Sequence, residues 1–186
     1  MTGPIKRPER VSFVEAMQTG ALLLQAGRAQ DALPHLKRAF QLAPTDVDAA
    51  INLGGAYVML NRPTQAIPIL EKAADLDPEN SKIWINLGAA YLGNPILATS
   101  DKQARAVTAF EKALELDPSA PSVNYNLGLI LRDRGDMQGA IAQFRRAAAI
   151  NPLDRDAHSL LARLEQRSIN EAERDGQTAS GDHNGE

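Results

Sequence analysis

The sequence predicts an all-α fold, an α-solenoid built of stacked antiparallel helix pairs. A unit of about 34 residues recurs along the chain. Each copy has one glycine, two alanines and one proline at corresponding places. In that order they are Gly20, Gly54, Gly88 and Gly128; Ala32, Ala66, Ala106 and Ala140; Ala39, Ala73, Ala113 and Ala147; and Pro44, Pro78, Pro118 and Pro152. Such regular recurrence predicts a repeat array.

Each unit also contains two stretches with the spacing of an amphipathic helix. In the third unit, Ile83 and Leu87 mark the first stretch, and Val107, Phe110 and Leu114 mark the second. The glycines and alanines let neighbouring helices approach closely, and the closing proline cannot continue the helix before it. One helix pair cannot bury its own apolar face, so we expect successive pairs to stack.

The third copy carries a complete set of residues that form a known repeat signature. They are Trp84, Leu87, Gly88, Tyr91, Ala106, Phe110 and Pro118. With this pattern the chain resembles the tetratricopeptide repeat family. The resemblance implies a right-handed superhelix whose concave side is lined by the first helix of every repeat.

The repeats divide the chain into segments. We expect a polar leader at 1–12, a capping helix at 155–169 and a disordered tail at 170–186, because the tail has almost nothing to bury. The four repeats between leader and cap are expected at 13–46, 47–80, 81–120 and 121–154.

The third repeat contains an insertion of six residues between its two helices. Gly93 followed by Pro95 predicts the end of the first helix. Ser100 followed by Gln103 has the form of a capping box, so the second helix is expected to begin near Asp101.

Two apolar residues, Ile96 and Leu97, fall in this inserted loop. One interpretation is that they fold back over the ends of their own helices. The other is that they contact a partner. The sequence leaves both open.

Composition excludes several function classes. A net charge of -3 gives no basic face for nucleic acid, and no cysteine is present for disulfides or thiolate metal sites. The longest apolar stretch is too short to span a bilayer and the start lacks a secretory signal, so a cytoplasmic protein without membrane or nucleic-acid partners is expected. His35, His158 and His183 have no catalytic or ligand neighbours in sequence, so we expect no enzyme activity, no metal and no cofactor.

Candidate binding residues come from the first helices, which the resemblance places on the concave side. Asn52, Asn86 and Asn126 each precede the Leu-Gly pair. A ladder of side-chain amides can hold an extended peptide by its backbone, although each amide could instead bond a neighbouring repeat and lock the stack. The flanking residues expected in the groove are Met17, Leu24, Ile51, Gly55, Met59, Lys82, Ile85, Ala89, Tyr125, Leu129 and Arg132.

This wall is largely apolar, and part of it is expected to be ordinary core between repeats. Family members that grip a C-terminal carboxylate use basic and amide residues on the inner face, and only Asn52 and Lys82 coincide with that pattern here. An apolar or amphipathic segment suits the wall better.

We therefore expect a non-catalytic scaffold that binds an extended or amphipathic segment of another protein, and that is a monomer or a weak homo-oligomer. Two alternatives remain. The array could be a self-assembly module, or it could be a regulatory subunit of a specific enzyme complex.

Overall fold

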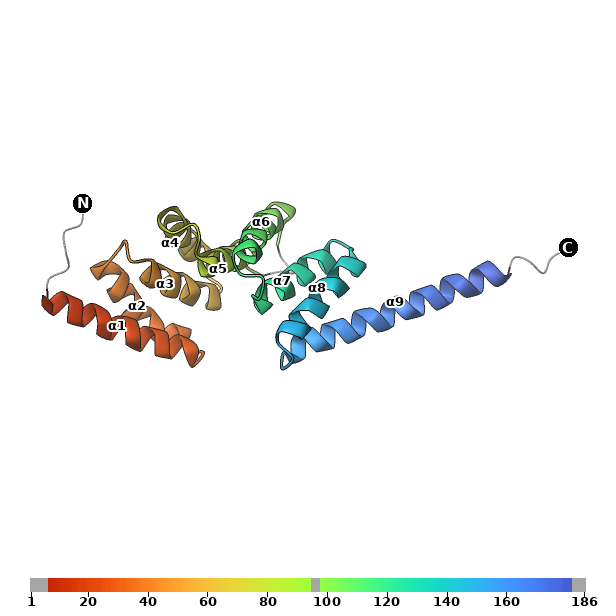
Figure 1. Ribbon diagram of the computed structural model, residues 1–186, viewed down its shortest axis with the longest axis horizontal. Coiled ribbons are helices and arrows are strands. Elements are labelled where there is room, and N and C mark those ends of the chain that lie inside the picture. The colour runs from red at the N-terminus through yellow and green to blue at the C-terminus, as the bar shows by residue number, and fades with distance from the viewer. Residues whose placement is uncertain (1–6, 95–97, 182–186) are drawn as a thin grey trace. The chain divides into compact units, whose positions relative to one another are not determined.

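The computed structural model describes residues 7–94 and 98–181, and these residues form nine helices and no strand (Figure 1). By its internal contacts the chain divides into two compact units, Met1–Pro118 and Ser119–Glu186. Each unit consists of helices packed in chain order. The predicted all-α solenoid class is confirmed.

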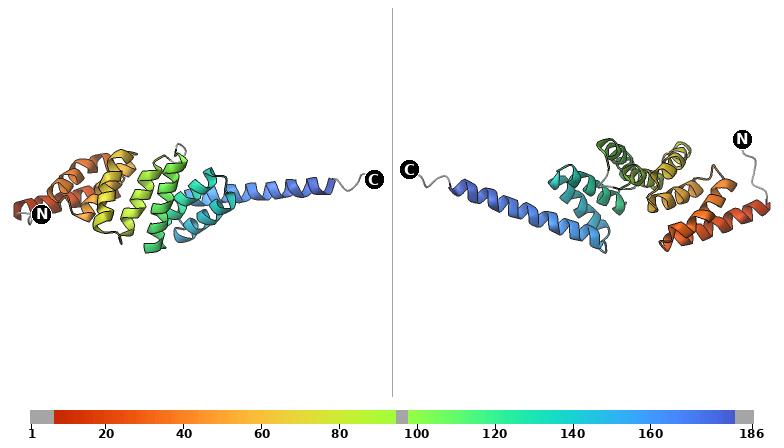
Figure 2. Two further views of the ribbon diagram at one scale, coloured as in Figure 1. Left: turned by 90° about the horizontal axis from the view of Figure 1, so that it is seen from above. Right: turned by 180° about the vertical axis from the view of Figure 1, so that it is seen from behind.

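The first unit contains three helix pairs. In each pair the second helix packs against the first, and in the first two pairs it also packs against the first helix of the next pair. The two views in Figure 2 show this stacking in chain order. The helices are α1 (Arg7–Gln25), α2 (Ala29–Leu42), α3 (Val47–Met59), α4 (Pro63–Leu76), α5 (Ser81–Leu92) and α6 (Ser100–Leu116).

The second unit contains one helix pair and a long final helix. The pair is α7 (Pro121–Asp133) and α8 (Met137–Ile150), and α9 (Arg155–Gly181) packs against α8 through its N-terminal part. Ala157 of α9 is fully buried and lies with Ala147 and Ala148 of α8 in one apolar cluster. Two polar contacts continue the docking, from Arg145 to Glu165 and from Gln138 to Ser168.

The recurring small residues lie where the helices of a pair meet. All eight repeat alanines are at most 1% exposed. Each repeat glycine faces a large apolar side chain of its own second helix. The glycine and its partner are Gly20 and Leu36, Gly54 and Leu70, Gly88 and Phe110, and Gly128 and Phe144.

Prolines and aspartates mark the helix boundaries. The four repeat prolines each follow the residue that caps a second helix, as their sequence positions predict. Asp46 and Asp136 cap the helices α3 and α8, because each carboxylate accepts a hydrogen bond of 2.8 Å from the third residue after it. Asp154 accepts in the same way from Ala157 at the start of α9.

The structure corrects three predicted boundaries. α1 begins at Arg7, within the predicted leader 1–12. α6 begins at Ser100 with Thr99 as its cap, since the Thr99 hydroxyl accepts from the backbone N–H of Lys102, so the predicted capping box at Ser100 is wrong by one residue. Ile96 and Leu97 lie outside the described residues.

The third correction concerns the C-terminus. α9 continues to Gly181, beyond the predicted cap at 155–169 and into the predicted disordered tail. The described residues from Asn170 to Arg174 are exposed, as the polar composition indicates. Pairs one turn apart line this stretch, from Arg167 to Glu171 and from Gln166 to Asn170, and such pairs stabilise a helix that buries nothing. Within the described part of the chain, no helix is both long enough and apolar enough to cross a membrane.

Candidate functional site

The predicted binding residues of the first unit lie on its first helices, α1, α3 and α5. The side chains that remain at least partly exposed form what we call the first-helix surface. Its residues are Met17 and Leu24 of α1, Asn52, Gly55 and Met59 of α3, and Lys82, Ile85, Asn86 and Ala89 of α5.

Two asparagines lie at corresponding places on this surface. Asn52 and Asn86 are half-buried, and neither amide forms a hydrogen bond with any described residue. Asn86 lies close to α3, because a Cβ atom added to Gly55 would lie 3.6 Å from its amide nitrogen. The structure therefore shows no bond from these two amides to a neighbouring repeat's backbone.

The apolar wall is part surface and part core. Met59 is 53% exposed, and Met17 and Ile85 are half-buried. Ile51, by contrast, is 8% exposed and belongs to the core cluster of the first unit, so it is not available to a ligand in this structure. Leu24 packs against the same cluster.

The predicted residues of the second unit have partners within their own unit. The amide of Asn126 donates to the Ser122 carbonyl at 2.9 Å, one turn earlier in α7. Arg132 forms an ion pair of 2.8 Å with the next residue, Asp133. Leu129 is half-buried on α7.

Tyr125 is half-buried against its own unit. Its ring meets Phe144 edge to face, with 5.6 Å between the ring centres. Burial raises the pKa of Tyr125, and the carboxylates of Asp156 and Asp154 raise it further. Much of the Tyr125 side chain is therefore covered by its packing against α8 and the start of α9.

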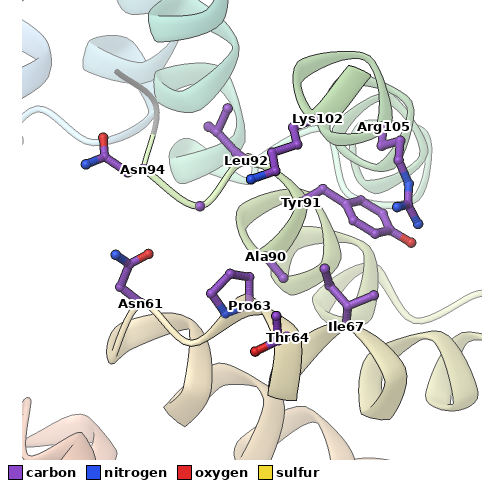
Figure 3. Close-up of a pocket in the computed structure, with 11 residues that line it drawn as sticks. Asn61, Pro63, Thr64, Ile67, Ala90, Tyr91, Leu92, Asn94, Lys102 and Arg105 are labelled. Carbon is purple, nitrogen blue, oxygen red and sulfur yellow. The ribbon is translucent and has the colours of Figure 1, made fainter. Parts of the chain in front are cut away.

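The structure also contains a pocket that the sequence did not predict. It has a volume of about 340 Å³ and lies between the second and third repeats (Figure 3). We call it the seam pocket. Pro63 and Ile67 of α4 face Ala90, Tyr91 and Leu92 of α5 across it.

Polar side chains surround this apolar lining. Asn61 comes from the turn before α4 and Thr64 from the start of that helix. Asn94 comes from the inserted loop, and Lys102 and Arg105 come from the first turns of α6. All five residues are exposed. The seam pocket shares no residue with the first-helix surface.

One wall of the seam pocket is fixed by a polar network. The Tyr91 hydroxyl donates to Glu71 at 2.8 Å, and the Arg105 guanidinium pairs with the same carboxylate oxygen at 3.1 Å. The guanidinium also lies 4.1 Å from the centre of the Tyr91 ring. Burial, followed by the hydrogen bond to Glu71, raises the pKa of Tyr91.

One local signal could have pointed to the seam pocket. Asn61 has a positive φ of 52°, at the place where the first and fourth repeats have Gly27 and Gly135. Asparagine tolerates this left-handed conformation better than most residues, and unlike glycine it adds a side chain to the turn. The insertion that supplies Asn94 is a second signal, but its geometry does not follow from its sequence.

The two histidines within the described residues take no part in either surface. His35 is exposed on α2, and His158 is exposed on α9, where its Nε2 atom lies 3.1 Å from the Pro152 carbonyl oxygen. His183 lies outside the described residues. Among the described residues, no three histidine, aspartate or glutamate side chains gather in a way that could hold a metal ion.

Comparison with protein families finds the same repeat along most of the chain. Three models, each described as a tetratricopeptide repeat, match residues 23–67, 47–90 and 100–155. The matches therefore include parts of all four predicted repeats. A comparison with curated protein sequences found no match.

Comparison with solved structures finds similar folds. The Pseudomonas aeruginosa PilF structure has 21% identity and a TM-score of 0.71, and the match covers 88% of this chain and 72% of that one. A MamA mutant has 26% identity and a TM-score of 0.65 over 88% of this chain and 92% of that one. A second MamA structure has 22% identity and a TM-score of 0.63 over 87% and 96%.

Proposed function

Because the chain belongs to the tetratricopeptide repeat family of protein-interaction scaffolds, we propose that it binds an extended or amphipathic segment of another protein on its first-helix surface. The proposal includes no catalytic step. It is supported by the chemistry of α1, α3 and α5, which offer both amides and apolar side chains.

The observation that carries the proposal is the pair Asn52 and Asn86. Both amides are accessible, occupy the same place in successive repeats and bond no described residue. A side-chain amide both donates and accepts, so each can pair with one peptide unit of a bound segment. Asparagine is a poor residue for the middle of a helix, and binding gives a reason for its recurrence there.

Around the amides, the surface suits apolar side chains of the ligand. Met17 and Met59 are flexible and adapt to different shapes. Ile85 adds a stiffer apolar contact. Gly55 and Ala89 are small and leave room for the segment. Lys82 is exposed and adds one positive charge at the start of α5.

The test is the double variant Asn52→Ala and Asn86→Ala. Alanine is the better helix former, so thermal stability should be kept or slightly raised. Affinity for a segment identified by pull-down from native cells should fall by about 0.5 to 1.5 kcal/mol for each lost hydrogen bond, as measured by titration calorimetry. The control is Gln41→Ala, which removes an exposed amide from α2 and should leave affinity unchanged.

Unchanged affinity in the double variant would exclude the amides as the binding device. A large fall in melting temperature would show that they stabilise the stack instead. Either result would leave Met17, Met59 and Ile85 as the remaining candidates on this surface.

A second candidate function is self-assembly through α1. Two large apolar residues of this helix are exposed, Val14 at 43% and Leu22 at 65%. Exposed apolar residues on one helix are suited to contact another copy. Light scattering over a concentration series separates the candidates, because a self-assembly module gains mass with concentration and loses that gain in Leu22→Glu.

A further inference from the structure

We propose that the seam pocket is a second binding site, which takes an acidic side chain and a neighbouring aliphatic side chain from a segment of a partner protein. The site lies at the edge of the second and third repeats and shares no residue with the first-helix surface. It therefore goes beyond the proposed function, and it can be tested separately.

The aliphatic part of the ligand follows from the lining. Pro63 and Ile67 are partly exposed apolar residues of the lining, and the apolar residues Ala90 and Leu92 are buried beside them. A volume of about 340 Å³ is at the small end of ligand pockets. It suits one aliphatic side chain and the backbone beside it better than a large cofactor.

The acidic part follows from an uncompensated positive charge. The carboxylate of Glu71 already pairs with Arg105. Lys102 is exposed at the rim and forms no ion pair with any described residue. In Figure 3 its side chain extends over the pocket from α6, opposite Asn61 and Pro63. A carboxylate bound there would neutralise the positive charge of Lys102.

The charges at this place differ between the third repeat and the first. Lys102 and Arg105 stand four residues and one residue before the first repeat alanine. In the first repeat the same two places are occupied by Arg28 and Asp31, which form an ion pair of 2.8 Å with each other. The third repeat thus has two cations where the first has a neutral pair.

Asn61 supplies a polar group on the opposite rim. Its backbone holds a left-handed conformation that glycine holds in the first and fourth repeats. The turn itself therefore does not require an asparagine side chain. Its amide has no hydrogen-bond partner among the described residues, and it can pair with the backbone of a bound segment.

The experiment selects peptides from a random displayed library on the full chain, in parallel with two variants. Lys102→Glu reverses the charge at the rim, and a glutamate in the first turn of α6 suits the helix N-terminus, so folding should be retained. Lys72→Glu is the matched control, since Lys72 is exposed on α4 and does not line the pocket. Circular dichroism confirms that both variants are folded.

We expect peptides that bind the wild-type chain and Lys72→Glu, but are lost on Lys102→Glu, to share an aspartate or glutamate close to a leucine, isoleucine or methionine. A synthetic peptide of this kind should bind Lys102→Glu about tenfold more weakly, a difference typical of one charge-assisted contact. Replacing its acidic residue by the matching amide should weaken binding to the wild-type chain to a similar extent. Asn61→Gly should weaken binding while it keeps the turn.

Nuclear magnetic resonance titration locates the bound peptide. Shifts at Thr64, Gly93 and Lys102 are expected, with little change at Asn52 and Asn86. If no acidic peptides are selected, or if both lysine variants bind the peptide equally, the proposal is wrong. Shifts confined to Asn52 and Asn86 would also overturn it and would at the same time support the first-helix surface.

Discussion

At the residue scale, the missing side chain of one glycine per repeat sets the distance between the two helices of that repeat. A Cβ atom on Gly128 would lie 2.8 Å from Phe144, closer than real Cβ contacts allow. Gly88 is tighter still against Phe110. Both phenylalanine rings are fully buried, so they have no free space into which to move.

This geometry predicts opposite effects for two glycines only one repeat apart. Gly88→Ala should destabilise the protein by about 1 to 3 kcal/mol, because the added methyl group overpacks a contact that cannot relax. Gly55→Ala should be neutral or stabilise by up to about 1 kcal/mol, because its methyl group meets only the Asn86 amide at ordinary contact distance and alanine favours the helix. Equilibrium urea unfolding measures both. Equal effects would contradict the close approach at Gly88.

The recurring glycines and alanines could be predicted from the sequence, whereas individual side-chain hydrogen bonds could not. The small residues follow from periodicity alone, because the two helices of every repeat approach each other at the same place. Periodicity also placed Asn52 and Asn126 alike, yet only Asn126 bonds its own helix. That difference depends on local side-chain geometry. Asn61 was not predicted to be a pocket residue, because its left-handed backbone conformation cannot be read from the sequence.

At the element scale, the helix types and most boundaries followed from the sequence, and the errors have physical causes. Thr99 and Ser100 are both good capping residues, so the sequence alone could not decide between them. α9 was predicted too short because burial was used as the criterion for order. Its polar part is instead lined by pairs such as Arg167 and Glu171.

The network between α4, α5 and α6 predicts a dependence of stability on alkaline pH. The pKa of Tyr91 is raised above its ordinary value of 10.0 by burial and by Glu71, so the folded state binds the phenolic proton more tightly than the unfolded state. The contribution of Tyr91 to the free energy of unfolding is fully present below pH 10, and it is lost as pH rises through the pKa that Tyr91 has in the folded state. Unfolding midpoints in urea should therefore fall above pH 10.

The variant Tyr91→Phe should reduce this alkaline loss, because it removes the titrating group and keeps the ring beneath Arg105. Tyr125 also has a raised pKa and should retain a separate share of the loss, which Tyr125→Phe removes. Each variant differs from the wild-type chain by one hydroxyl group only, so the difference between their alkaline declines belongs to that tyrosine. An identical alkaline decline in Tyr91→Phe would contradict the assignment.

At the scale of the whole molecule, α9 ends the second unit by acting as the first helix of a further repeat. His158 lies six residues after Pro152 and approaches its carbonyl, just as Trp84 donates to the Pro78 carbonyl six residues before it. Ala157 is fully buried at the place that Ile83 and Val123 occupy in the third and fourth repeats. In a repeat array each helix pair depends on the neighbour that covers it. α8 therefore depends on the first part of α9, and the later part of α9 covers nothing described in this unit.

Two truncations test this division of α9. A chain that ends at residue 169 loses only residues beyond the contacts to α8, so its melting temperature should match that of the full chain. A chain that ends at residue 154 loses Ala157 and the polar contacts of Glu165 and Ser168, and uncovers Ala147 and Ala148. Each lost kcal/mol lowers the melting temperature by about 2 to 4 °C in a chain of this size, so a fall of more than about 4 °C by circular dichroism is expected.

Limited proteolysis of the chain that ends at residue 154 should cut within α7 and α8 first, because local stability falls where the covering helix is lost. Equal melting of the two truncated chains would show that α9 does not stabilise α8.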